Sequence, residues 1–210
     1  MTLLETLRAR GCLQDASHYD ELNKLLEQKS LSFYCGFAPP AESLHVGSML
    51  PLILMRRLQE KGHTPIVVLG AATGMIGDPS GKSEERKFLS AADIAKNISG
   101  IEAQIKKFLL PTGKNAYQIK RNDEWLNKLS FLDFLRDVGK HSSVNQMLAK
   151  DSVKARLENR EQGISYTEFS YMLLQAYDFF WLNEHADCRL QVGGSDQWGN
   201  ITAGLDLIRR

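Results

Sequence analysis

Three short segments of the 210-residue chain carry polar residues beside glycines, in the pattern of loops that bind small anionic ligands. They span residues 34–48, 70–82 and 193–200. In an open parallel sheet, ligands bind outside the carboxyl ends of the strands, where glycine lets the backbone come close and helix N-termini offer amides to anions. His45 stands two residues before Gly47 at the start of a predicted helix, where an imidazole can stabilise phosphate oxygens that gain charge in a transition state. A surface histidine that caps the helix is the alternative interpretation.

Composition and motifs exclude several classes of function. The formal net charge of +1 gives no overall attraction to nucleic acid, so RNA contacts must be local or lie outside these residues. The P-loop pattern Gly-x-x-x-x-Gly-Lys-[Ser/Thr] and the dinucleotide pattern Gly-x-Gly-x-x-Gly are both missing. Cys12, Cys35 and Cys188 are odd in number and lack metal-ligand spacing, which predicts reduced thiols and no metal site. The N-terminus has no secretory pattern and no apolar run could span a bilayer, so we expect a cytoplasmic protein without membrane contact.

The elements that must position these segments follow from hydrophobic periodicity. Residues 1–30 carry leucines at helical spacing and predict an N-terminal helical segment. Residues 31–37 predict a buried strand, and residues 49–62 predict a helix that stops at Gly62. The β-branched run over residues 64–70 predicts a strand buried on both faces. Strand, helix and strand together form a βαβ unit, so we expect an α/β fold with a parallel sheet.

The rest of the chain is predicted to be mainly helical. Helices are expected near residues 84–87, 91–110, 125–139, 144–160 and 163–181, a strand over 188–194, and a last helix up to residue 210. Residues 70–83 are predicted to form a glycine-rich loop, and residues 111–122 to be irregular. Residues 125–160 carry more apolar side chains at helical spacing than one core needs, which suits contact with a partner chain. The chain stops inside the last predicted helix, so we expect a truncation.

Five motifs resemble those of bacterial-type tyrosyl-tRNA synthetases, which are class I aminoacyl-tRNA synthetases. They are Tyr-Cys-Gly-Phe-x-Pro-x-x-x-Ser-Leu-His-x-Gly at 34–47, Gly-Ala-Ala-Thr-Gly-x-Ile-Gly-Asp-Pro-Ser at 70–80, Gly-Lys-His-x-Ser-Val-Asn-Gln-Met at 139–147, Glu-Phe-Ser-Tyr-x-Leu-Leu-Gln-x-Tyr-Asp at 168–178, and Gly-Gly-Ser-Asp-Gln-Trp-Gly-Asn at 193–200. The resemblance runs from about residue 31 to the end of the chain. Five motifs in the family's order make chance a poor explanation.

The resemblance implies a Rossmann-like parallel sheet of the nucleotidyl-transferase type, with flanking helices and a helical insertion. It implies that residues 31–210 are a truncated catalytic domain and that the insertion at about 125–160 forms a homodimer contact. A Lys-Met-Ser-Lys-Ser-type loop and tRNA-binding domains are then expected beyond residue 210. The implied reaction converts L-tyrosine and ATP, with Mg²⁺, to tyrosyl-adenylate and pyrophosphate, and the complete protein transfers tyrosine to tRNA(Tyr). The chain alone is expected to bind tyrosine but to be inactive or weakly active.

The resemblance also implies a set of tyrosine-binding residues. Tyr34 and Asp178 match the two residues that hold the substrate phenol, and a buried acceptor left unpaired by phenylalanine would be costly. Asp78, Tyr171 and Gln175 match the cluster that binds the α-ammonium group. The spacing of Tyr171, Gln175 and Asp178 places them on one helix face. A helix that turns its polar side to solvent is the alternative for this pattern.

Further matches surround the tyrosine and the nucleotide. Asn122 matches a residue just behind the tyrosine, with Trp125 as a packing neighbour. Asp196 matches the carboxylate that binds the ribose, and Gln197 matches a side chain that approaches the tyrosine carboxyl group and the α-phosphate. Cys35 resembles a ribose-contacting residue, with a small buried apolar role as an equal alternative. The positions where the backbone must come close to the adenylate are Gly36, Gly47 and Gly194.

The resemblance implies a catalytic set of His45, Ser48, Lys82 and Arg86. Lys82 and Arg86 match cations that surround the departing pyrophosphate, although a solvated helix face is the usual meaning of such a cluster. Catalysis would then rest on positioning and charge neutralisation. The chain departs from the family where Ala38, Pro40 and Ser48 replace the common aspartate, threonine and second histidine. Ser48 can still donate a hydrogen bond, but Ala38 and Pro40 lack the side-chain oxygens, which removes one or two hydrogen bonds worth about 1 kcal/mol each.

Two other functions compete with tyrosine activation. A tryptophan-specific relative of the same fold is disfavoured by Tyr34 and Asp178, because an indole needs no phenol clamp. A synthetase-like RNA-binding or regulatory module without catalysis is supported only by the departures in the first motif and by the short chain.

Overall fold

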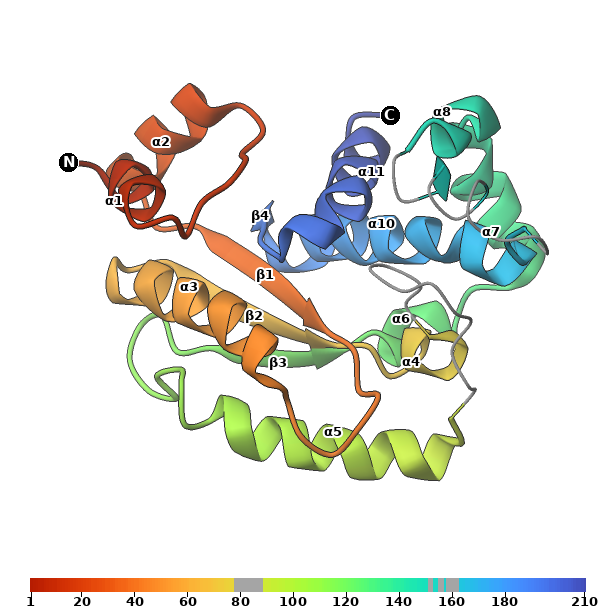
Figure 1. Ribbon diagram of the computed structural model, residues 1–210, viewed down its shortest axis with the longest axis horizontal. Coiled ribbons are helices and arrows are strands. Elements are labelled where there is room, and N and C mark those ends of the chain that lie inside the picture. Colours follow the sequence, from red (N-terminus) through yellow and green to blue (C-terminus); the bar gives the residue numbers. More distant parts are fainter. Residues whose placement is uncertain (78–88, 151–152, 155–156, 158–162) are drawn as a thin grey trace.

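The computed structural model describes residues 1–77, 89–150, 153–154, 157 and 163–210. At its centre, four strands form a parallel sheet in the order β3-β2-β1-β4 (Figure 1). The strands are β1 (Ser32–Phe37), β2 (Thr64–Leu69), β3 (Gln118–Arg121) and β4 (Cys188–Gln191). This order belongs to the doubly wound, Rossmann-like class, so the predicted α/β fold is confirmed.

β1, α3 (Met49–Glu60) and β2 form the predicted βαβ unit, with the short helix η1 (Val46–Ser48) leading into α3. The side chains of Leu52, Met55 and Leu58 follow helical spacing along α3 and are at most 1% exposed. The helix stops where Gly62 takes a φ of +95°, a conformation that glycine adopts without strain. All three elements begin and end within two residues of their predicted bounds.

Side chains of β1 alternate between two hydrophobic cores, one on each face of the sheet. Cys35 joins the larger core with residues of α3, of α5 (Ala91–Ile105) and of the N-terminal helices α1 (Leu3–Ala9) and α2 (Tyr19–Gln28). Tyr34 joins the second core, where its ring centroid lies 5.4 Å from that of Phe179. The alternation therefore directs Tyr34 and Cys35 to opposite faces.

The helices of the C-terminal part of the described chain pack on the Tyr34 face, while β4 adds a strand at the edge of β1. The helices are α10 (Tyr166–Ala186) and α11 (Trp198–Ile208), with η3 (Ser195–Gln197) before α11 and with α11 against α10 (Figure 1). A capping box between Ser165 and Glu168 begins α10. The helix continues five residues past its predicted end at Trp181, because Leu182 is fully buried and the ring of His185 stacks on that of Trp181.

Three other predicted boundaries are wrong. Residues 118–121 form strand β3 rather than an irregular segment, since a polar edge strand lacks the apolar alternation that reveals a strand. Thr73–Ile76 form helix α4 inside the predicted loop, where Gly74 fits against the ring of Pro39. The helix predicted to end at residue 110 ends at Ile105.

The predicted insertion is divided into short helices. They are α6 (Asp123–Leu126), α7 (Phe131–Asp137), η2 (Gly139–His141) and α8 (Val144–Leu148). The single helix predicted over 125–139 is interrupted because Ser130 begins α7 as an N-cap, accepting the Asp133 N–H at 3.1 Å. No helix within the described ranges is long and apolar enough to cross a membrane.

The contact between α10 and α11 depends on the absence of a side chain at Gly204. A Cβ atom there would lie 3.0 Å from Phe179 Cδ1 and 3.1 Å from Phe179 Cβ, and Phe179 is buried. Gly204→Ala is expected to lower the free energy of unfolding by about 1–2 kcal/mol, because this overpacking outweighs the gain in helix propensity. Urea denaturation measures the difference.

Gly139→Ala is the matched control, because a Cβ atom there makes only ordinary contacts, the nearest at 3.5 Å from Leu135 Cδ2. Its free energy of unfolding should change by less than about 0.5 kcal/mol. Equal stability of the two variants would contradict the close packing of α11 on α10.

Candidate active site at the switch point of the sheet

The candidate site lies where the strand order reverses, at the carboxyl ends of β1 and β4. β2 and β4 pair with opposite edges of β1, and this reversal opens a crevice in parallel sheets. Tyr34 pairs in register with Ile66 of β2 and Gln191 of β4, so it stands at the reversal. The turn through Gly193 and Gly194 follows β4 at the same end of the sheet.

The most constrained group of the site is the carboxylate of Asp178, which α10 places in the interior at 5% exposure. Trp125 donates its indole Nε1–H to Asp178 Oδ1 at 2.7 Å, and Asn122 donates through Nδ2 to Oδ2 at 3.1 Å. Burial nevertheless outweighs these two bonds and raises the pKa of Asp178 from 3.8 to about 7. Trp125 therefore packs in the second core, as predicted, and is in addition a hydrogen-bond donor to Asp178, which the prediction lacked.

Asn122 connects three elements behind this carboxylate. Besides its bond to Asp178, its Nδ2 group donates to Thr73 Oγ1 at 2.9 Å, and its Oδ1 accepts the Ala72 N–H at 2.9 Å. Its own backbone N–H donates to the carbonyl of Leu69 at 3.1 Å. Asn122 is 1% exposed, and these bonds pair both the oxygen and the nitrogen of its side-chain amide. Sequence reasoning missed Thr73, because a threonine in a glycine-rich segment carries no signal of its own.

The hydroxyl of Tyr34 lies buried on the same side of the sheet. Within the part of the chain that the structure describes, this oxygen has no hydrogen-bond partner. Burial first, and the neighbouring Asp178 charge second, raise the pKa of the phenol well above its ordinary value. A buried hydroxyl without a partner is costly, so the site favours a ligand that offers a hydrogen-bonding group there.

The ammonium cluster is only partly described. Tyr171 and Asp178 are buried on α10 and Gln175 is half-buried between them, which argues against a polar face turned to solvent. Asp78, Lys82 and Arg86 lie outside the described residues, so their predicted roles stay predictions.

The nucleotide end of the site is built from the turn after β4. A Cβ atom on Gly194 would meet the carboxylate of Asp196, whose exposed side chain would have to shift. Asp196 is exposed and accepts from Gln197 Nε2 at 2.8 Å. Gly36 is exposed, with open space where a side chain would stand. The backbone at Gly36 and Gly194 and the carboxylate of Asp196 are therefore all accessible to a ligand.

Cys35 is buried, and its alternative role as a core residue has direct support. It lies in the larger core, and burial together with the charge of Asp196 raises the pKa of its thiol to about 12. Contact of this thiol with a ribose stays a prediction.

His45 caps the helix that follows β1. Its Nδ1 accepts the Gly47 N–H at 3.1 Å, so a neutral ring carries its proton on Nε2. A Cβ atom on Gly47 would lie 3.0 Å from the imidazole, so the exposed ring would have to shift slightly. His45 is exposed, and Ser48 makes no capping bond at the start of α3. The capping geometry and the predicted phosphate contact are compatible, because capping uses only one ring nitrogen.

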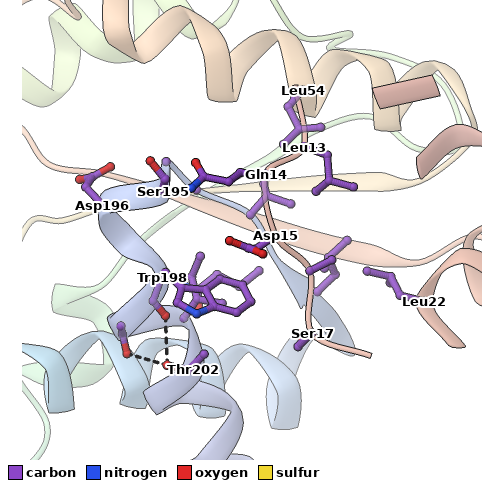
Figure 2. Close-up of a pocket in the computed structure, with 18 of the residues that line it drawn as sticks. Leu13, Gln14, Asp15, Ser17, Leu22, Leu54, Ser195, Asp196, Trp198 and Thr202 are labelled. Atoms are coloured by element: carbon purple, nitrogen blue, oxygen red, sulfur yellow. Dashed lines mark hydrogen bonds between the residues drawn. The ribbon is translucent and has the colours of Figure 1, made fainter. Parts of the chain in front are cut away.

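A pocket of about 770 Å³ adjoins the nucleotide end. Figure 2 shows it between the N-terminal segment around Gln14 and the turn at Ser195 and Asp196. Tyr34 and Asp178 do not line it, so this pocket and the buried carboxylate are separate parts of the region. Across the described ranges, no three His, Cys, Asp or Glu side chains are placed to hold a metal ion.

Comparison with known proteins identifies the family. The sequence model of the family described as "tRNA synthetases class I (W and Y)" matches residues 26–210. The chain belongs to this family of class I synthetases. The match to the family model begins at residue 26, close to residue 31, where the motif resemblance begins.

Relatives of this class I synthetase chain are close in sequence and in structure. It is 56% identical over 210 residues to a tyrosine-tRNA ligase of Roseiflexus castenholzii and 54% identical over 209 residues to one of Rhodopirellula baltica, with 100% of the chain aligned in each case. A C-terminally truncated mitochondrial tyrosyl-tRNA synthetase of Aspergillus nidulans superposes with a TM-score of 0.88 at 32% identity, over 99% of this chain and 61% of that structure. The chain spans about half the length of the two ligases, 49% and 48% respectively.

The raised pKa of Asp178 makes the stability of this synthetase chain depend on pH. The folded chain keeps a proton on Asp178 up to about pH 7, whereas the unfolded chain releases it near 3.8. The folded state therefore binds more protons between these values, and the free energy of unfolding falls as the pH rises through this window. From pH 5 to pH 8 the Asp178 contribution is roughly 2–3 kcal/mol.

Urea denaturation at pH 5, 6, 7 and 8 measures this loss, with Asp178→Asn as the variant that cannot titrate. As the pH rises, the free energy of unfolding of the native chain should fall relative to that of this variant. Parallel pH profiles for the two proteins would contradict the raised pKa.

Proposed function

We propose that this chain binds L-tyrosine through its phenol and is the part of its protein that activates tyrosine with ATP, forming tyrosyl-adenylate and pyrophosphate, with weak activity or none when it is alone. The observation that carries the proposal is the buried Asp178 carboxylate beside a Tyr34 hydroxyl that lacks a partner in the described chain. The names of the relatives, tyrosine-tRNA ligase in both, support the same substrate. A phenol offers one donor and one acceptor, which suits a carboxylate and a hydroxyl placed side by side.

Selectivity for tyrosine follows from the cost of leaving these groups unpaired. Phenylalanine would fill the same space but would leave Asp178 and Tyr34 without the bonds that a phenol supplies. Discrimination of this kind is established for tyrosyl-tRNA synthetases as a class. Tryptophan is the other substrate within the family, and an indole could donate to Asp178 but could not accept from Tyr34.

In the proposed reaction, a carboxylate oxygen of tyrosine attacks the α-phosphorus of ATP. A new oxygen–phosphorus bond forms, and the bond to the bridging oxygen breaks, so that pyrophosphate leaves with the electron pair. No proton has to move, so the protein acts by holding the reactants in line and by stabilising charge. We assign His45 Nε2–H, Lys82 and Arg86 to the phosphate oxygens, with Mg²⁺ entering as the ATP complex.

The proposal extends to the complete protein, whose relatives are twice as long as this chain. We propose that it transfers tyrosine to tRNA(Tyr), in the cytoplasm, as a homodimer. The free cysteines agree with a reducing compartment. Exposed apolar side chains in the insertion at 125–160 support the dimer contact. These side chains are Phe131, Leu132, Leu135, Val144, Leu148 and Leu157.

Calorimetric titration of the chain with L-tyrosine, L-phenylalanine and L-tryptophan tests the function. Only tyrosine should bind, and Asp178→Ala should weaken that binding about 100-fold or more, because it removes a buried charged acceptor. Asp187→Asn is the control. Asp187 is an exposed acid that follows the same helix, and asparagine tolerates its left-handed φ of +45°.

A folded chain that binds none of the three amino acids would contradict the proposal and favour a module without catalysis. Preferential binding of tryptophan would move the chain to the other specificity of its family.

A further inference from the structure

Asn200, which no motif role explains, lies at the junction of the two predicted subsites. It stands in the first turn of α11 and is 7% exposed. Its Nδ2 group donates to Gln175 Oε1 at 3.0 Å and to Gln197 Oε1 at 3.1 Å. Gln175 belongs to the predicted ammonium cluster of the tyrosine subsite, and Gln197 is predicted to approach the tyrosine carboxyl group and the α-phosphate, where the two subsites meet. One buried amide therefore joins the tyrosine subsite to the start of the nucleotide subsite.

The direction of each hydrogen bond in this chain is fixed by chemistry. The Asp196 carboxylate can only accept, so the Gln197 atom that faces it at 2.8 Å is the Nε2 group. The Gln197 oxygen then faces Asn200, which must present its own NH₂ group there. The same NH₂ group reaches Gln175, whose oxygen must face it. A continuous order of donors and acceptors therefore runs from Asp196 to Gln175.

The two glutamines are held by very different elements. Gln175 projects from the middle of α10, a helix of 21 residues that packs along α11. Gln197 lies in η3, a three-residue turn that follows two glycines. A long packed helix positions its side chains without help, whereas a short turn depends on the bonds made to it. Through its bonds to Gln175 and Gln197, Asn200 therefore ties the turn that carries Gln197 and Asp196 to the rigid helix α10.

We propose that Asn200 is a positioning residue that couples the tyrosine subsite to the adenylate subsite. This inference rests on the proposed function, because it assigns Gln175 to the tyrosine ammonium group, Gln197 to the tyrosine carboxyl group and the α-phosphate, and Asp196 to the ribose. Asn200 itself touches neither ligand in this account. Its effect should appear only when one ligand occupies both subsites.

The test compares two ligands on the 210-residue chain by calorimetry. One is L-tyrosine, and the other is a stable tyrosyl-adenylate analogue with a sulfamate in place of the phosphate. The ratio of their dissociation constants measures what the nucleotide subsite adds. Asn200→Asp, which keeps the shape but loses the donor, should lower this ratio about tenfold, the effect of one or two lost hydrogen bonds. The dissociation constant of L-tyrosine should change less than about threefold.

Two comparisons separate positioning from a general loss of structure. Asn183→Ala removes another part-buried asparagine bond, from Nδ2 to the Cys188 carbonyl at 3.0 Å, and should leave the ratio unchanged. Asn200→Asp and Gln197→Ala should be non-additive for the analogue, because both changes act through Gln197. Additive losses would overturn the inference.

A second pair of variants keeps the test decisive if Asn200→Asp does not fold. Gln175→Ala and Gln197→Ala leave Asn200 in place, and coupling between the subsites requires their losses for the analogue to be non-additive. Additivity overturns the inference, as does an unchanged ratio in a folded Asn200→Asp. Failure of the native chain to bind L-tyrosine would instead overturn the proposed function itself.

Discussion

The Asp178 carboxyl group is buried at 5% exposure, and the neighbouring side chains supply the hydrogen bonds that water would have supplied. An unpaired buried carboxylate costs several kcal/mol, so it persists only with hydrogen-bond donors around it. Trp125 and Asn122 are those donors, and each needs support of its own. The Trp125 ring stacks on Trp181 at 4.3 Å, which aims its Nε1–H, while Asn122 is tied to the ends of β2 and α4. The short elements α4 and α6 thus support the carboxylate, and α6 also contributes Trp125 and Leu126 to the second core.

The same arrangement explains why burial leaves the site receptive. Two donors do not saturate the four lone-pair positions of a carboxylate, and burial still raises its pKa to about 7. A further donor, such as the phenol proposed as ligand, would favour the ionised form and complete the set. At the other end, glycines and the Asn200 bonds keep Asp196 and Gln197 accessible and ordered. The strand order brings both ends to one crevice.

The fold could be predicted from the sequence because its signals are local, whereas the site residues were assigned from the motif resemblance. Periodicity alone predicts strand β2 from the run at 64–70 and helix α3 from the residues before it. It also places Tyr171, Gln175 and Asp178 on one helix face. What sequence reasoning missed depends on partners distant in sequence. Strand β3 is polar and exists through pairing with β2, and Trp125 reads as a core residue until its contact 53 positions away is known. Thr73 and Asn200 act through single bonds to other elements, which no spacing reveals.

The most direct test of the account is the indole N–H of Trp125, observed by ¹H–¹⁵N NMR as the pH is raised from 5 to 9. The chain has three tryptophans, and Trp125→Phe assigns the resonance. The account predicts that this resonance alone shifts strongly with a midpoint near pH 7, and that Asp178→Asn abolishes the titration. An indole signal that does not move, or that moves equally in Asp178→Asn, would contradict the buried carboxylate on which the site depends.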